Sequence, residues 1–257
     1  MASSLFDLSG KVALITGAHR GIGLAIAEEM ANAGAAVAIC SDDAEGIALA
    51  AGRLRGSGLN ALGIACDVGV DGELDRLVAE TERQLGAIDI LVCNAGINPH
   101  FGPTAAASDD EYDAIMRINL RSVVQLTNRV TPGMSARRDG VIILTSSLSG
   151  LRGNARIGVY SLSKAALAQH ARNLAVELGE YNVRANAISP GLIRTDFATP
   201  ILSNEDGLQR RLEKTPLRRV GEAREIAGAA VFLAARAGAF VTGHNLVVDG
   251  GTLISDA

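Results

Sequence analysis

Short apolar runs alternate with longer segments of helical pattern along almost the whole chain. Seven runs have the near-continuous apolar character of strands that are buried on both faces of a parallel sheet: Val12 to Thr16, Ala36 to Cys40, Ala61 to Cys66, Ile88 to Cys93, Val141 to Thr145, Val183 to Ile188 and Leu246 to Val248. The helical segments between them cover residues 21–33, 43–55, 71–85, 109–134, 158–179 and 222–236. Such strands and helices connect through right-handed crossovers. The sequence therefore predicts an α/β fold with a doubly wound, seven-stranded parallel sheet.

The chain is expected to form a single domain, residues 1–257, because no repeat, low-complexity tract or linker divides it. Residues 195–215 interrupt the alternation with a short polar, partly helical insertion. Two interpretations of this insertion stay open, a lid over a pocket and a plain surface loop.

Charge and hydropathy argue against a nucleic-acid or membrane partner. The net charge is -4, so no basic surface for nucleic acid is implied. Residues Met1 to Phe6 show no basic segment followed by an apolar one, and no apolar run reaches the roughly 18–20 residues of a membrane span. We expect a cytoplasmic protein with neither a nucleic-acid nor a membrane partner.

Cysteine and histidine spacing gives no indication of a metal site. The three cysteines form no C-x-x-C pair, and the four histidines form no H-E-x-x-H pattern. Each cysteine instead ends a predicted strand. Cys40 and Cys66 are expected on adjacent strands, close together and reduced.

A glycine-rich turn follows the first predicted strand. It reads Thr16-Gly17-Ala18-His19-Arg20-Gly21-Ile22-Gly23 and leads directly into the first helical segment. Glycines let the backbone turn tightly and approach a pyrophosphate, while the helix N-terminus adds unpaired N–H groups and a partial positive charge. In this position the turn favours a dinucleotide-binding Rossmann unit over a purely structural turn. His19 is expected to be exposed.

The end of the second predicted strand bears on which dinucleotide is bound. A carboxylate accepts hydrogen bonds from the ribose hydroxyls of NAD and repels the 2′-phosphate of NADP. Asp42 and Asp43, which follow Ser41 there, therefore favour NAD, and Arg20 in the glycine turn is the opposing signal. Asp67, which leaves the third strand, is interpreted either as an adenine contact or as a turn residue.

The run Tyr160-Ser161-Leu162-Ser163-Lys164 places a phenol and an ammonium on one face of a helix. A phenol alone titrates near a pKa of ~10, and a cation held nearby favours its ionised form. The pair predicts an acid–base group in which Lys164 lowers the pKa of Tyr160. A surface contact is the alternative.

These features occur in a distinctive order along the chain. In sequence they are the glycine turn, Asp67, Cys93-Asn94-Ala95-Gly96, Asn119, Ser147, Tyr160, Lys164 and Pro190-Gly191. By this order the chain resembles the short-chain dehydrogenase/reductase family over nearly its whole length. The interval from Ser147 to Tyr160 matches that of the family and selects Ser147 over Ser146 and Ser149. The resemblance implies a nicotinamide cofactor, NAD in preference to NADP, and interconversion of a carbonyl compound and an alcohol.

Four catalytic residues are implied by the resemblance. Tyr160 would exchange a proton with the substrate oxygen, and Ser147 would polarise that oxygen. Lys164 would bind the nicotinamide ribose and lower the pKa of Tyr160, and Asn119 would position a water that connects Lys164 to solvent. The resemblance also implies cofactor contacts from Gly17, Arg20, Gly21, Ile22, Gly23, Ser41, Asp42, Asp67, Val68, Asn94, Ala95, Gly96, Tyr160, Lys164, Pro190, Gly191, Ile193 and Thr195.

Two departures from the family pattern affect these expectations. Cys93 replaces an asparagine, so one side-chain hydrogen bond is expected to be lost near the fourth strand. Ser41 stands where NAD-dependent members usually carry Asp, and Asp42 comes one residue later. An acidic residue at this second place still disfavours a phosphate.

Substrate contacts are expected from loops at the carboxyl ends of the strands. Residues 97–102, 148–154 and 192–212 mix apolar and small side chains, which predicts a small, moderately apolar ketone or secondary alcohol. Arg152 and His100 are either ligands for an anionic group or solvated side chains. Family members are commonly homotetramers, and the Ala-rich helical segments 159–177 and 222–236 support the same expectation here.

Three other functions stay open. An NADPH-dependent reductase of 3-oxoacyl thioesters would need a basic residue for the 2′-phosphate, and Asp42 and the net charge argue against it. A dinucleotide-sensing regulatory protein usually lacks the Tyr or the Lys. A non-redox structural protein would make the set of Ser147, Tyr160 and Lys164 a coincidence.

Overall fold

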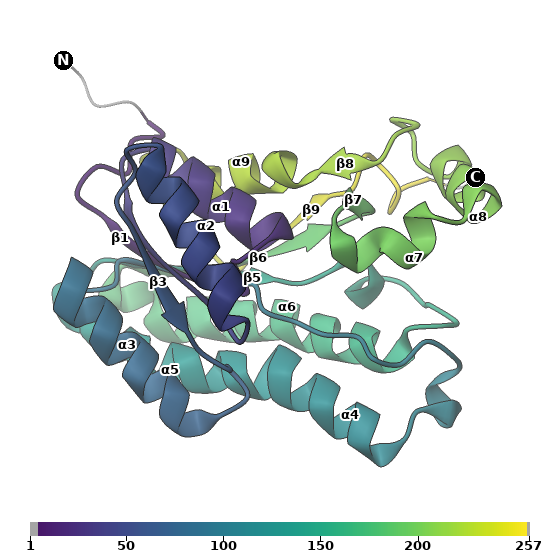
Figure 1. Cartoon of the computed structure of the whole chain (residues 1–257), viewed down its shortest axis with the longest axis horizontal. Helices are drawn as coiled ribbons and strands as arrows, with labels where there is room; N and C mark the ends of the chain where they lie inside the picture. The colour runs from purple at the N-terminus through teal and green to yellow at the C-terminus, as the bar shows by residue number, and fades with distance from the viewer. Residues whose placement is uncertain (1–4, 256–257) are drawn as a thin grey trace.

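A computed structural model describes residues 5–255. Within this range seven strands form one parallel sheet in the order β3-β2-β1-β4-β5-β6-β9 (Figure 1). The chain starts at the centre of the sheet, winds to one edge, returns to the centre and winds to the other edge, which confirms the predicted doubly wound fold. The strands are β1 (Val12–Thr16), β2 (Ala36–Ser41), β3 (Ala61–Ala65), β4 (Ile90–Cys93), β5 (Gly140–Thr145), β6 (Val183–Pro190) and β9 (Asn245–Val248).

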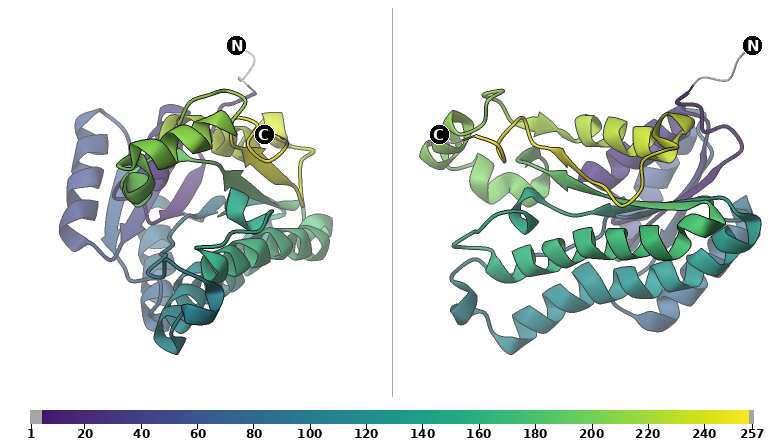
Figure 2. Two further views of the ribbon diagram at one scale, coloured as in Figure 1. Left: turned by 90° about the vertical axis from the view of Figure 1, so that its right-hand side faces the viewer. Right: turned by 180° about the vertical axis from the view of Figure 1, so that it is seen from behind.

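Helices cover both faces of this sheet, as the views in Figures 1 and 2 show. One face carries α1 (Gly21–Asn32), α2 (Ala44–Gly56) and α9 (Ala223–Ala234), and the other carries α3 (Asp71–Leu85), α5 (Ser122–Arg137) and α6 (Gly158–Leu178). Successive strand residues point to opposite faces. In β1, Ala13 and Ile15 therefore pack against α1 and α9, while Leu14 packs on the other face.

The segment expected as one helix over residues 109–134 is two helices joined by a π-helical turn. Helix α4 (Asp109–Met116) starts with a capping box in which Ser108 and Glu111 each bond the other's backbone N–H. The π turn (Arg117–Arg121) follows and runs into α5. Single π turns inside helices often mark functional positions, and this one carries the buried Asn119.

The insertion after β6 contains two short helices, α7 (Thr199–Leu202) and α8 (Glu205–Glu213), which agrees with its expected partly helical character. It also contains a feature that was not predicted. The two-residue strands β7 (Ile193–Arg194) and β8 (Gly221–Glu222) pair in parallel and close the base of the insertion. Strands this short show no periodicity in the sequence.

Cys40 and Cys66 lie on adjacent strands, as expected. Cys40 is in β2, Cys66 follows β3 directly, and both thiols are buried and free. A hydrogen bond in which the Cys40 thiol donates to the Cys66 sulfur, together with burial, raises the pKa of Cys40 well above its ordinary value. No helix between residues 5 and 255 is long and apolar enough to cross a membrane.

Candidate active site

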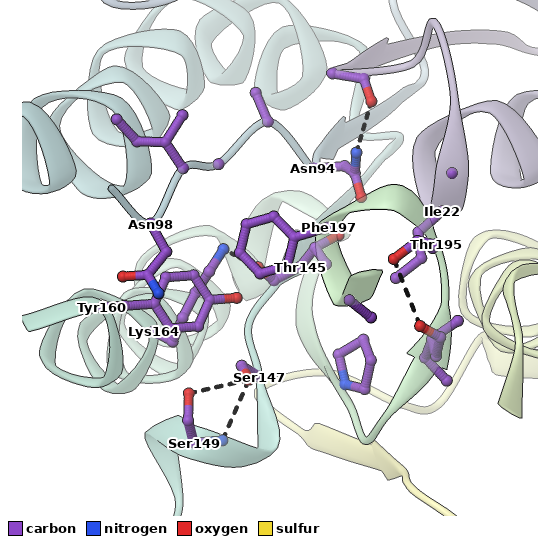
Figure 3. Close-up of a pocket in the computed structure, with 18 of the residues that line it drawn as sticks. Ile22, Asn94, Asn98, Thr145, Ser147, Ser149, Tyr160, Lys164, Thr195 and Phe197 are labelled. Atoms are coloured by element: carbon purple, nitrogen blue, oxygen red, sulfur yellow. Dashed lines mark hydrogen bonds between the residues drawn. The ribbon is translucent and has the colours of Figure 1, made fainter. Parts of the chain in front are cut away.

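A cavity of about 600 Å³ opens at the carboxyl ends of the strands, where the strand order reverses between β1 and β4. This is the place where doubly wound sheets bind their ligands. Its walls come from the glycine turn, the ends of β2 to β6, helix α6 and the insertion that contains α7 and α8. Figure 3 shows side chains from these elements converging on one space.

Nearly every residue predicted for the site lines this cavity. Of the predicted cofactor residues, only Gly23 does not line the wall. Three of the four predicted catalytic residues, Ser147, Tyr160 and Lys164, line it, and Asn119 is fully buried behind it. The structure therefore brings together residues that are up to about 180 positions apart in the chain, because most follow strands that end at the same edge and α6 places Tyr160 and Lys164 beside them.

The glycine turn is shaped so that side chains cannot occupy it. Gly17 has φ +62°, and a Cβ there would lie 2.7 Å from the Ala95 Cα. A Cβ on Gly23 would lie 2.4 Å from the Gly17 carbonyl oxygen. Gly23 therefore packs directly against the backbone of the turn and does not line the cavity. No side chain caps the N-terminus of α1, and its first turn carries no acidic residue. The turn thus leaves backbone N–H groups free for a pyrophosphate, and these residues fit the phosphates of a dinucleotide.

Asn94 fixes the glycine turn against the end of β4. Its Nδ2 donates to the carbonyl oxygens of Thr16, at 3.1 Å, and Gly17, at 2.9 Å. The Thr16 hydroxyl accepts in return from the backbone N–H groups of Asn94 and Ala95. Cys93, one residue earlier, is buried in the core. The single amide of Asn94 therefore holds the turn in place without a second asparagine.

The polar residues after β2 separate into different roles. The Asp43 carboxylate caps α2 by accepting from the Gly46 N–H at 2.9 Å. Asp42 lines the cavity and accepts a 3.2 Å hydrogen bond from the Ser41 hydroxyl. The Ser41 oxygen also lies 2.8 Å from the His19 Nδ1. His19, expected to be exposed, instead keeps only 18% of its side chain accessible, because this contact draws it into the cavity wall.

Asp67 forms a turn, and its contact with adenine stays a prediction. Its Oδ1 accepts from the Gly69 N–H at 2.8 Å. It also lines the cavity beside Val68.

The catalytic candidates converge at the start of α6. The Lys164 ammonium donates to the Thr145 carbonyl oxygen at 2.8 Å and lies 5.4 Å from the centre of the Tyr160 ring. Ser147 follows β5 and accepts from both the backbone N–H, at 3.2 Å, and the hydroxyl, at 3.0 Å, of Ser149 (Figure 3). A helical spacing of four and a strand end are thus sufficient to place three functional groups on one wall.

Burial changes the proton affinities of this group. It raises the pKa of Tyr160 to about 12, and a hydrogen bond with Ser147 lowers it only in part. It lowers the pKa of Lys164 to about 8, since the ammonium is 3% exposed. Burial thus acts on the pKa of Tyr160 in the direction opposite to the lowering expected from Lys164. The ammonium faces the ring and the Thr145 carbonyl, and desolvation of the phenol dominates.

Asn119 holds the loop that follows β4. Its Oδ1 accepts from the Ile97 N–H at 2.8 Å, and its Nδ2 donates to the Ile97 carbonyl at 2.9 Å and to the Ser163 hydroxyl at 3.2 Å. A Cβ on Gly96 would lie 3.3 Å from the Lys164 Nζ and 3.4 Å from the Asn119 Oδ1. Asn119 and Lys164 thus both lie close to Gly96.

One suggested ligand for an anion is placed elsewhere. His100 is 7% exposed, and its ring nitrogens contact the Glu111 carboxylate at 3.1 Å and the Pro103 carbonyl at 3.0 Å. It does not line the cavity. Its role is to hold the loop after β4 against α4. Arg152, the other suggested ligand, does line the cavity.

Several further residues line the cavity, and of these Asn98, Phe197 and Arg211 lie in the predicted substrate loops. The hydroxyls of Thr215 and Thr252 lie 2.9 Å apart and close one end of the cavity with Arg211. The Asn98 Oδ1 and the Thr145 Oγ1 are buried and have no hydrogen-bond partner among residues 5–255. Phe197 places its ring 5.8 Å from that of Tyr160. These residues come from loops whose course depends on the whole fold. The described part of the chain holds no cluster of His, Cys, Asp or Glu able to bind a metal ion.

A doubly wound sheet with a glycine turn at its carboxyl edge and a Tyr–Lys pair in the same cavity is typical of an oxidoreductase that uses a nicotinamide dinucleotide on alcohols or ketones. Residues 17–252 match the family model described as enoyl-(acyl carrier protein) reductase. The chain belongs to the short-chain dehydrogenase/reductase family.

Relatives and solved structures agree with this assignment. The chain is 37% identical to dehydrogenase/reductase SDR family member 4 of Sus scrofa, over 95% of this chain and 88% of the relative. It is 38% identical to the mitochondrial family member 2 of Homo sapiens, over 95% and 86%. A gluconate 5-dehydrogenase from Burkholderia cenocepacia, solved with NADP and tartrate, superposes with a TM-score of 0.94 at 35% identity and covers 99% of this chain and 100% of its own.

Proposed function

We propose that this protein transfers a hydride between a nicotinamide cofactor and a small ketone or secondary alcohol, with Ser147, Tyr160, Lys164 and Asn119 as its catalytic set. The observation that supports this most is the placement of Tyr160 in one cavity with the Ser147 hydroxyl, the Lys164 ammonium and the glycine turn. Proton donor, polarising hydroxyl and dinucleotide cradle are thus within one site.

The bound nicotinamide supplies or accepts the hydride at its C4 atom. Tyr160 gives its phenolic proton to the carbonyl oxygen during reduction and takes it back during oxidation. Ser149 donates twice to the Ser147 oxygen, so the Ser147 proton is directed away from Ser149, towards Tyr160 and the substrate oxygen. Lys164 holds the cofactor ribose, and Asn119 keeps the loop beside it in place and positions a water on the path from Lys164 to solvent.

We further propose that residues 1–257 act as one domain in which the insertion 195–215 is a lid. Two contacts support this. Arg20 of the glycine turn forms a 3.1 Å ion pair with Asp196, and Phe197 packs on the Tyr160 ring. Both lie over the cavity, where a closed segment would exclude water from the reacting groups.

The carboxylate of Asp42 supports NAD as the preferred cofactor over NADP. We expect Asp42→Arg to shift the ratio of kcat/KM for NADPH over NADH upwards by about tenfold or more, because a guanidinium pairs with a 2′-phosphate that a carboxylate repels. Asp42→Asn is the matched control and is expected to give a smaller shift, since it removes repulsion without adding attraction. Unchanged discrimination in both variants would show that Asp42 does not face the ribose.

We propose a homotetramer, which large exposed apolar side chains support. Val176 on α6 is 85% exposed, and Phe240 beside β9 is fully exposed. Contact with further copies of the chain would remove these two side chains from water. Sedimentation equilibrium is expected to give about four times the chain mass at micromolar protein, and a monomer would contradict the proposal.

The proposed function is tested by absorbance at the reduced-nicotinamide band. Purified protein is mixed with NAD or NADP and a panel of secondary alcohols, and with NADH or NADPH and a panel of ketones. Cofactor-dependent turnover of at least one pair is the expected result. If dinucleotide binds while no alcohol or ketone in a broad panel reacts, a sensing role replaces the enzymatic one.

A further inference from the structure

Two arginines in the cavity have no counter-charge. Arg152 lies in the loop after β5 and Arg211 lies in the last turn of α8, and both line the same cavity as Tyr160 and Ser147. Neither guanidinium makes a hydrogen bond or an ion pair with any residue in the described range 5–255. Helix α8 and the C-terminal end of the chain lie together at one end of the molecule (Figure 1).

The other charged groups in the cavity wall are already paired or lie elsewhere. Arg20 pairs with Asp196, and Lys164 donates to a backbone carbonyl. The remaining acidic lining residues, Asp42 and Asp67, follow β2 and β3, on the side of the cavity away from α8. The wall between α6 and α8 therefore carries uncompensated positive charge.

The placement of Arg211 is supported by its surroundings. Its side chain is half-buried, and its carbonyl oxygen accepts from the Thr215 hydroxyl at 3.0 Å. Thr215 in turn contacts Thr252, so the C-terminal segment anchors the end of α8. Burial, followed by the charge of Arg152, lowers the pKa of Arg211. The two neighbouring guanidinium groups repel each other, which destabilises the unliganded protein. A bound anion would offset this repulsion.

We propose that the substrate of this enzyme carries an oxyanion, a carboxylate or a phosphate, which Arg152 and Arg211 bind while the substrate carbonyl lies at Tyr160. This inference rests on the proposed function and narrows its substrate from a neutral ketone to an anionic one. Guanidinium groups suit both anions, because their planar fork matches two oxygens at once. Phe197, Pro200 and Ile201 line the same region and would contact the apolar part of the molecule between its two ends.

The first test measures anion binding without turnover. Thermal unfolding is followed with succinate, with inorganic phosphate and with neutral succinamide, at ionic strength held constant with sodium chloride. Succinate or phosphate is expected to raise the melting temperature in a saturable way, since a ligand that binds the folded state stabilises it. The shift should disappear in Arg211→Met and in Arg152→Met. It should persist in Arg210→Met and Arg156→Met, which change neighbouring exposed arginines outside the cavity.

The second test measures selectivity with matched substrates. A keto acid is compared with its methyl ester, and a keto phosphate with its unphosphorylated parent, as ratios of kcat/KM. The wild type is expected to favour one anionic member by about 10–100-fold, mainly through KM, as bidentate charged hydrogen bonds do. The ratio should fall towards one in Arg211→Met, with NADH binding as the measure of folding, and stay high in Arg210→Met. The pair with the larger ratio distinguishes carboxylate from phosphate.

The outcomes separate the two proposals. If neutral ketones react while anions neither bind nor are preferred, the anion site is wrong and the proposed function stands. If anions bind through the two arginines but no carbonyl compound reacts, the oxidoreductase function fails and the anion site stands. If no anion changes the melting temperature and no anionic substrate is preferred, the anion proposal is overturned in either case.

Discussion

Replacing Tyr160 with Phe is expected to lower kcat by about 10²–10⁴-fold, the usual contribution of a positioned general acid or base. The change removes one oxygen and leaves the ring, which packs on Phe197 and lies near the Lys164 ammonium. Cofactor affinity should therefore change little. Steady-state rates give kcat, and quenching of NADH fluorescence gives the dissociation constant.

The control for this substitution is Tyr112→Phe on α4, whose side chain is 44% exposed and lies outside the cavity. It removes the same oxygen and is expected to leave kcat unchanged. If Tyr160→Phe keeps near-normal turnover, the proton comes from another group, and the proposed role of the phenol is lost. If it abolishes NADH binding as well, Tyr160 supports the cofactor site and its effect on kcat cannot be assigned to acid–base chemistry.

The raised pKa of Tyr160 decides which protonation state of its phenol is present at neutral pH. With a pKa of about 12, the phenol keeps its proton throughout the neutral range. A protonated phenol is ready to act as an acid towards a carbonyl oxygen, whereas alcohol oxidation needs it as a base. The positive ring of an oxidised nicotinamide supplies the charge that favours ionisation. We therefore expect the protonation state of the phenol to depend on the charge of the bound cofactor.

The fold was predictable because its strands are buried on both faces. Runs such as Val12–Thr16 are apolar throughout and are separated by helices, and this pattern alone defines a parallel sheet. The π turn at Arg117–Arg121 was missed, since its residues continue the helical pattern on either side. Strands β7 and β8 were missed because a strand of two residues is too short to show an alternating pattern of apolar and polar side chains. Their pairing depends on the course of the insertion and not on local sequence.

The site was predictable where function follows directly from a strand end. Asp42, Asn94 and Ser147 each follow a strand, so sheet topology alone brings them to one edge. Arg211 and Thr252 reach the same cavity through segments whose path no local pattern encodes. From sequence we expected a lowered pKa for Tyr160, whereas burial raises it. Burial decides that value, and the spacing of a Tyr and a Lys carries no information on burial.

The second large effect is expected from Lys164→Met, which should stabilise the folded chain while it reduces turnover. Burial lowers the pKa of Lys164 from 10.5 to about 8, so the charged form costs the folded state about 3 kcal/mol below that pH. Methionine has a similar length and no charge, but it leaves the Thr145 carbonyl oxygen without its donor, at a cost of about 1 kcal/mol. The free energy of unfolding at pH 7 should therefore rise by about 2 kcal/mol.

The pH dependence of the stability gain from Lys164→Met distinguishes the removal of a buried charge from an improvement in packing. The pKa of Lys164 is lower in the folded chain than in the unfolded one, so the unfolded state binds the extra proton between about pH 8 and pH 10.5. The free energy of unfolding of the wild type should rise with pH across this window relative to that of Lys164→Met, and the gain from the substitution should shrink accordingly. Urea titrations at pH 7 and at about pH 9.5 measure it, with the exposed Lys214→Met as control, which should change stability by less than about 0.5 kcal/mol. A gain that stays constant with pH would show that Lys164 bears no buried charge. A lysine that weakens the fold and remains in the site is expected only where its charge is required for binding and proton transfer.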